Sequence, residues 1–162
     1  MAGDYRIFDE PQPGALEHLA VRPMWPLLAM MMAGGWLAWP WFILNSIAIG
    51  SPTRTREIVT VFISFVGTVA LVAVTIALHD RGIIESELSL QLMALAIVCW
   101  KLATAYMIDQ WQSRTIDVYE YYGGTVRSGL VVLVLGVIFR PGIVDGFGSG
   151  LWRQVMSIGV IS

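Results

Sequence analysis

Long apolar runs alternate with short polar connections along this chain. Residues 25–49 and 58–78 contain no charged side chain, and residues 88–108 contain only Lys101. A helix needs about 20 predominantly apolar residues to cross the hydrocarbon core of a bilayer. The three runs therefore predict three transmembrane helices.

A fourth apolar run is shorter and leaves two interpretations. Its uninterrupted part, residues 129–139, would rise only about 16 Å as a helix, whereas the hydrocarbon core is about 30 Å thick. Extending the helix back to Tyr121 gives a span over residues 121–140 but places Arg127 inside the membrane. The alternative is a re-entrant half-helix followed by a second membrane contact. We favour the full span, so the predicted fold is an all-α integral membrane protein with a four-transmembrane-helix bundle over residues 23–140.

Both ends of the chain are expected to be short amphipathic segments. Residues 1–22 are polar and rich in turn formers, and within them residues 15–21 suit either a short helix on the membrane surface or a solvated tail. Acidic residues stand where a cleavable signal peptide needs basic ones, so the first apolar run is expected to stay in the mature protein. Residues 141–162 contain a glycine-rich hinge and then the apolar stretch 151–161, typical of an interfacial or partner-contacting helix.

Composition supports the membrane interpretation. Of the 162 residues, 56% are hydrophobic and 14% charged, whereas soluble domains are roughly one-quarter charged, so much of the surface must face lipid or a partner. The net charge of −2 and the scattered basic residues argue against a nucleic-acid partner. Cys99 is the only cysteine, which excludes a disulfide or a cysteine-based metal site within one chain. No cofactor is expected.

Small residues in the first two runs predict close helix packing. Glycine, alanine and serine at spacings of three and four put a thin stripe on one face of a helix, where another membrane helix can approach. The predicted packing positions are Gly34, Gly35, Ser64, Gly67, Ala70, Ala73 and Ala77. They favour assembly with other membrane-protein subunits or with further copies of this chain.

Two cations within the predicted spans are the best functional clue. If the third and fourth spans are antiparallel neighbours, Lys101 and Arg127 lie at nearly the same depth, about 9–10 Å inside the membrane. Asp109, Asp117 and Glu120 follow Lys101 in the connecting polar stretch. Charges at such depth suit three interpretations: side chains that snorkel to the headgroups, a salt-bridge network joining the two spans, or a site for an anion, a lipid phosphate or a transported solute.

No catalytic motif accompanies these residues, so we expect no enzyme activity. The main functional prediction is a small polytopic subunit that acts in the structure or assembly of a membrane complex. The alternative is a homo-oligomeric channel or small-solute transporter in which Lys101 and Arg127 line a basic vestibule. With four spans the basic residues divide evenly between the two sides, so the positive-inside rule does not decide the orientation.

Overall fold

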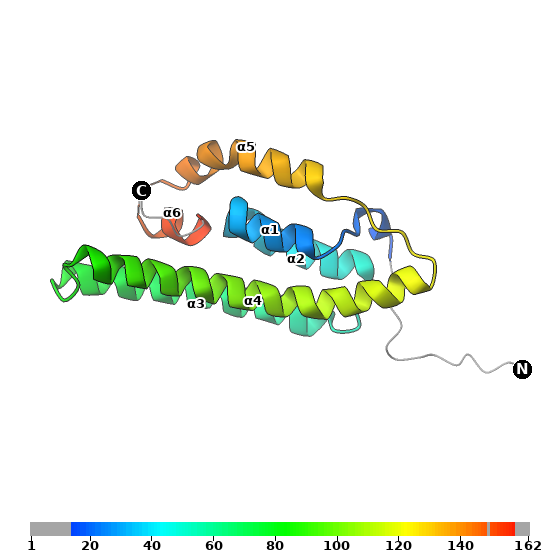
Figure 1. The fold of residues 1–162 in the computed structure, drawn as a ribbon, viewed down its shortest axis with the longest axis horizontal. Helices are drawn as coiled ribbons and strands as arrows, with labels where there is room; N and C mark the ends of the chain where they lie inside the picture. Colours follow the sequence, from blue (N-terminus) through cyan, green and yellow to red (C-terminus); the bar gives the residue numbers. More distant parts are fainter. Residues whose placement is uncertain (1–13, 149, 158–162) are drawn as a thin grey trace, which may run out of the picture.

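The structure, a computed structural model, describes residues 14–148 and 150–157. Within these residues the fold is all-helical, and the only strand-like pairing is a single backbone bridge between Val21 and Arg127. The helices form three layers, with α5 on one side, α1, α2 and α6 in the middle, and α3 and α4 on the other side (Figure 1). The helices are η1 Glu17–Leu19, α1 Met24–Met32, α2 Gly35–Ile49, α3 Arg54–Asp80, α4 Glu87–Tyr121, α5 Leu130–Gly146 and α6 Leu151–Met156.

Two long antiparallel helices, α3 and α4, run the length of the molecule (Figure 1). They have 27 and 35 residues, and both are long and apolar enough to cross a membrane. They confirm helices at the predicted spans 58–78 and 88–108. Helix α4 also continues through residues 109–120, which were expected to form a separate interfacial segment. No glycine or proline interrupts the chain there, so nothing in the backbone ends the helix before Tyr122.

The prediction of one continuous span over residues 25–49 is wrong. This run forms two helices, α1 and α2, joined at Gly34, whose φ of +105° is open to glycine but strained for other residues. Helix α2 returns to the start of α1, where the backbone N–H of Val21 donates to Asn45 Oδ1 at 2.9 Å. The run is therefore a helical hairpin with its tip at Gly34.

The fourth predicted span, 121–140, also changes. Helix α5 begins only at Leu130, because the chain leaves α4 through Gly123 (φ +88°) and crosses a non-helical connection. Arg127 lies in that connection and not within a helix. Helix α5 then runs through Pro141 to Gly146, farther than predicted.

The ends of the chain are only partly described. In place of a helix over residues 15–21, the chain has the single 3-10 turn η1. The glycine hinge is narrower than predicted and lies between α5 and α6, with Gly148 and Gly150 at positive φ. Residues 1–13 and 158–162 of the predicted amphipathic ends lie outside the described residues.

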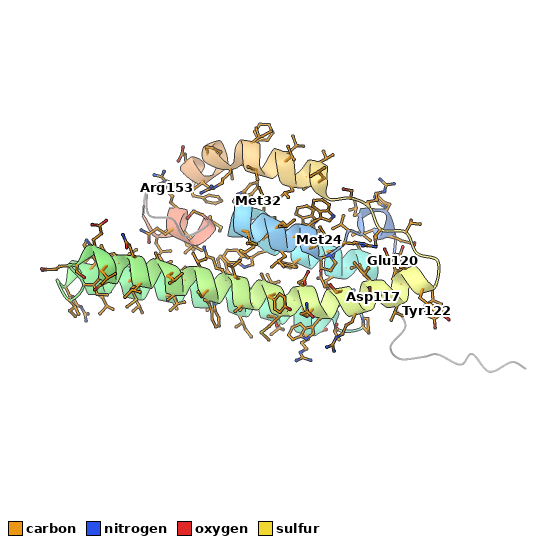
Figure 2. All side chains as sticks on the ribbon, in the orientation of Figure 1. Met24, Met32, Asp117, Glu120, Tyr122 and Arg153 are labelled. Atoms are coloured by element: carbon orange, nitrogen blue, oxygen red, sulfur yellow. The ribbon has the colours of Figure 1, made fainter. Side chains whose placement is uncertain are left out.

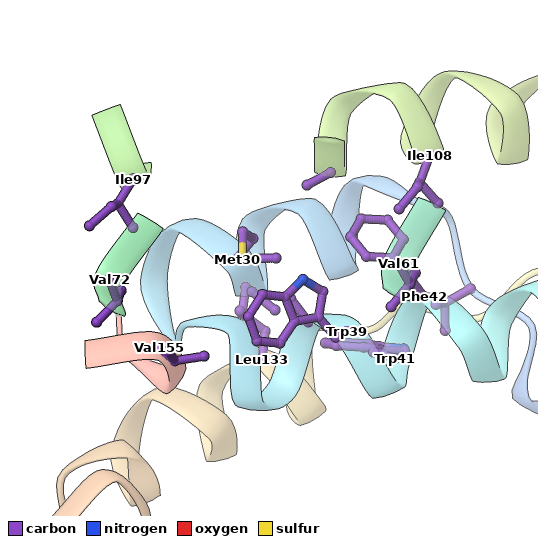
Figure 3. Packing of buried hydrophobic residues seen from close by; sticks show 14 residues of the cluster. Met30, Trp39, Trp41, Phe42, Val61, Val72, Ile97, Ile108, Leu133 and Val155 are labelled. Atoms are coloured by element: carbon purple, nitrogen blue, oxygen red, sulfur yellow. The ribbon is translucent and has the colours of Figure 1, made fainter. Parts of the chain in front are cut away.

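The core lies where the hairpin packs on the long helices. Phe42 of α2 lies beside Val61 of α3 and Ile108 of α4 at one end of the cluster, and Val155 of α6 lies at the other end, with Met30 of α1 between them (Figure 3). The core is therefore not formed by four helices that each span the molecule. The α1–α2 hairpin and α6 together form the middle layer (Figure 1).

Candidate functional site

Apolar side chains lie on the outside of this molecule as well as in its core. Large apolar side chains cover the outside of α3, α4 and α5, including Phe62, Val66, Leu95, Val131 and Phe139. The interior holds many polar groups beside its apolar core. The buried polar and charged residues are Asn45, Ser46, Ser51, Glu57, Ser64, Thr68, Thr75, Lys101, Thr104, Asp109, Gln112, Thr115 and Ser157.

Lys101 is the central charged group of this interior, with only 2% of its surface exposed. Its Nζ donates to the backbone carbonyls of Val155 and Ser157 at 2.8 Å each and to that of Gln154 at 3.4 Å. These carbonyls belong to the C-terminal end of α6, where the helix dipole favours a positive charge. The ammonium thus satisfies acceptors that α6 cannot satisfy within so short a helix.

An aromatic ring lies beside the ammonium, and two hydroxyl groups are linked to that ring. The Nζ atom lies 5.9 Å from the centre of the Trp39 ring, within the range of a cation–π contact. Trp39 Nε1 donates to Ser64 Oγ at 3.2 Å, and Ser64 Oγ lies 2.6 Å from Thr104 Oγ1. One polar cluster therefore joins α2, α3, α4 and α6 at the level where the hairpin tip and α6 meet.

A second buried cluster centres on Glu57, in the first turn of α3. Its Oε1 accepts hydrogen bonds from the hydroxyls of Ser51 and Thr53, and its Oε2 accepts one from Gln112 Nε2 at 3.0 Å. No ion pair reaches Glu57 in the part of the chain that the structure describes. Three donors and the N-terminal end of the helix stabilise this buried carboxylate.

Gln112 extends the Glu57 cluster to the hairpin. Its Nε2 also donates to the carbonyl of Phe42 at 3.0 Å, and its Oε1 accepts from Asn45 Nδ2 at 2.9 Å. Asn45 in turn accepts the backbone N–H of Val21. This chain of hydrogen bonds connects the segment before α1, helix α2, the 50–53 turn and the start of α3 to the C-terminal half of α4.

The predicted cluster of five charged residues does not form. Asp117 and Glu120 lie near the end of α4 that approaches Tyr122 (Figure 2), and Asp117 is about 24 Å along the helix from Lys101. Asp109 is buried and Asp117 exposed, and neither forms an ion pair among the described residues. Glu120 pairs with Arg22 at 3.1 Å. Lys101 is held by α6 carbonyls and not by carboxylates.

Arg127 is likewise separate from Lys101. Its backbone N–H donates to the carbonyl of Ala20 at 2.9 Å, which places it beside the entry to the hairpin. The prediction that Lys101 and Arg127 lie at the same depth in the membrane required residues 109–120 to form a connection between two helices. Because α4 continues to Tyr121, Arg127 follows the end of that helix and Lys101 lies near its middle.

The predicted packing residues divide into two groups. A side chain at Gly34 would meet the carbonyl of Met156, one at Gly35 would meet Trp39, and one at Gly67 would meet the Trp100 ring that packs across α3. The buried face of α3 follows Ser64 but then turns through Thr68 and Val72. Consequently Ala70, Ala73 and Ala77, the remaining members, are exposed in the single chain.

Sequence reasoning missed the Glu57 and Gln112 cluster. One signal was available: buried positions on α4 recur at spacings of three and four, and they continue past residue 108 through Gln112 and Thr115 to Tyr119. Interpreting residues 109–120 as a headgroup-level connection hid that continuation.

Comparisons with family models, curated proteins and solved structures find no match to this chain. Within the described residues, no group of three His, Cys, Asp or Glu side chains is arranged to hold a metal ion.

Proposed function

We propose that this chain is an integral membrane protein with three crossing helices and two re-entrant elements. The observation that carries the proposal is the apolar exterior together with buried polar groups, with large apolar side chains outside and Lys101, Glu57 and Gln112 inside. Lipid tolerates an apolar exterior that water would not, and polar groups in membrane helices face the protein interior. In this arrangement α3 and α4, the two described helices that are long and apolar enough to cross a membrane, span the bilayer. Helix α5 has 17 residues that rise about 26 Å, nearer the ~30 Å core than α1 or α2, and we assign it as the third crossing.

Helix lengths support the two re-entrant elements. Helices α1 and α2 have 9 and 15 residues, which rise about 13 Å and 22 Å, less than the ~30 Å hydrocarbon core. The hairpin enters from the end that holds the 50–53 turn, and α6 enters from the other end (Figure 1). Non-helical backbone at membrane depth needs partners for its polar groups, and Lys101 supplies them to the end of α6.

We further propose that the protein acts as a structural or assembly subunit of a membrane complex. Both buried clusters are satisfied internally, and Ser46 Oγ is the one buried side-chain polar atom without a partner among the described residues. Such clusters stabilise the packing of the helices, and their polar groups are already used in hydrogen bonds within the protein. The outward stripe of Ala70, Ala73 and Ala77 on α3 is thin enough to admit a helix of another subunit or of a second copy.

The rival function, a channel with a basic vestibule at Lys101 and Arg127, has little support in this geometry. Lys101 is buried and donates to three carbonyls, so it lines no open mouth. Arg127 lies outside the helices and away from Lys101.

Site-specific photocrosslinking tests the assembly proposal. A benzophenone side chain at Ala73 is expected to give a discrete protein adduct in native membranes, because Ala73 lies in the outward small-residue stripe of α3, where the partner helix would pack. Val131 on α5 is an equally outward control, expected to give no such adduct. Equal adducts at both positions, or none at Ala73, would count against α3 as the assembly surface.

A further inference from the structure

Helix α2 carries a ridge with an apolar groove on each side. Trp36, Pro40 and Leu44 lie four residues apart on one face of the helix and line both grooves. The groove toward α3, about 490 Å³, is lined only by apolar residues and glycine, among them Phe62 and Phe65. The groove toward α5 is of similar size, about 450 Å³.

The groove toward α5 has a cationic end. Arg127, Ser128 and His18 line it together with Leu37 and Val132. The guanidinium of Arg127 forms no ion pair with the residues that the structure describes, whereas the neighbouring Arg22 is paired with Glu120. Arg127 therefore has its charge available to a ligand.

The N-terminus of α5 adds to this positive end. Gly129 occupies the N-cap and has no side chain to cap the helix, and the Ser128 hydroxyl accepts the N–H of Leu130 at 3.3 Å. The N-terminal end of a 17-residue helix carries partial positive charge and binds anions readily. A guanidinium, a hydroxyl and a helix N-terminus thus converge where the apolar groove ends.

We propose that this site binds one anionic glycerophospholipid. Its phosphate lies at Arg127 and the start of α5, and its two acyl chains lie in the two grooves on either side of the Trp36–Pro40–Leu44 ridge. Arginine suits this role because its planar fork can donate two hydrogen bonds to one phosphate. The inference rests on the proposed membrane insertion.

The dimensions agree with a lipid in one leaflet. From Leu44 to Trp36, α2 rises about 12 Å, close to half of the ~30 Å hydrocarbon core. The cationic end lies beside Leu44 and Asn45, and the hairpin tip lies at the other end of the ridge. A headgroup at Arg127 therefore leaves the chains pointing toward the middle of the bilayer. A soluble phosphate would leave both apolar grooves unused.

Native mass spectrometry of the full chain in detergent tests the proposal with two lipids of identical chains. Phosphatidylglycerol is expected to bind one-to-one and more tightly than phosphatidylcholine. Arg127→Gln should weaken phosphatidylglycerol binding about tenfold. It should weaken phosphatidylcholine binding less, because the choline cation already offsets the phosphate charge that attracts Arg127. Arg114→Gln, an exposed arginine on α4 that lines neither groove, is the matched control. Leu44→Trp should weaken both lipids, because its larger ring narrows a groove and each lipid needs both grooves for its two chains.

Three outcomes would overturn the lipid site. These are equal binding of the two lipids, equal losses in Arg127→Gln and Arg114→Gln, and displacement of phosphatidylglycerol by millimolar inorganic phosphate. Carbonate extraction of membranes measures insertion separately. A chain that resists extraction but binds lipid without preference refutes this site alone, whereas a chain released by carbonate refutes the membrane proposal itself.

Discussion

Among individual residues, Lys101 has the clearest structural role, because its ammonium holds the end of α6 against α4. Its position inside an apolar helix singles it out in the sequence, but its partners are backbone carbonyls more than fifty residues later. The sequence offers carboxylates nearby, such as Asp109, as partners for a buried cation. The end of a short helix is an alternative acceptor that residue identities do not reveal, because every residue has a carbonyl.

Replacing Lys101 tests this role. Lys101→Met keeps much of the side-chain volume but leaves the carbonyls of Val155 and Ser157 without their donor. We expect a loss of roughly 1–3 kcal/mol in the free energy of unfolding, measured by titration of detergent-solubilised protein with a denaturing detergent. Ala103→Met, an exposed position on the same helix, should change stability little. Stability equal to that of the unmodified chain would show that Lys101 does not hold α6.

Glu57 and Gln112 allow a second test at this scale. Each single change, Glu57→Leu or Gln112→Leu, removes one partner of the same hydrogen bond, so the losses in unfolding free energy should not add. A double-mutant cycle is expected to give a coupling of about 0.5–3 kcal/mol. Additive losses would mean that the two side chains do not interact in solution.

At the scale of the element, Gly34 determines whether residues 25–49 span or fold back. The apolar run is long enough for one span, and hydropathy has no signal for a reversal of direction. Gly34-Gly35 was interpreted as a thin packing surface, although Gly34 is needed for its positive φ. The continuous apolar and helix-forming pattern of α3 was, in contrast, sufficient to predict that element. The outward stripe of Ala70, Ala73 and Ala77 was predicted as a contact face, and only a partner can test it.

Gly34→Ala is expected to disrupt the hairpin. A Cβ atom there would lie 2.5 Å from the carbonyl oxygen of Met156, and the φ of +105° is strained for alanine. The expected loss in unfolding free energy is about 2 kcal/mol or more. Gly142→Ala in α5 is the matched control, since nothing lies within 4 Å of its Cβ position and alanine favours the helix. If both variants unfold alike, the tip of the hairpin is not a constrained turn.

For the whole molecule, the hairpin changes which end each arginine lies at, compared with the prediction of four spans. It returns the chain to the end where it began, so residues 14–23, the 50–53 turn and the 122–129 connection lie together (Figure 1). The arginines at that end of the described chain are Arg22, Arg54, Arg56, Arg114 and Arg127. The opposite end holds Arg81, Arg140 and Arg153. The even division expected for four spans is replaced by an excess on one side.

This excess predicts the orientation of the proposed membrane protein. By the positive-inside rule, the end with five arginines faces the cytoplasm. In a Cys99→Ala background, Ile83→Cys should react with a membrane-impermeant maleimide added to intact cells, and Thr55→Cys should react only after permeabilisation. Both residues are exposed in the structure. The reverse pattern of labelling would contradict the orientation.

Composition and periodicity were enough to predict a helical chain, long apolar helices at 58–78 and 88–108, and the position of Lys101 within one of them. Each segment carries these properties locally. The fold-back at Gly34, the continuation of α4 to Tyr121 and the partners of Lys101 and Glu57 became clear only from the packing of the helices. Those depend on which distant carbonyls and side chains meet in space, and a hydropathy pattern records only how apolar each segment is.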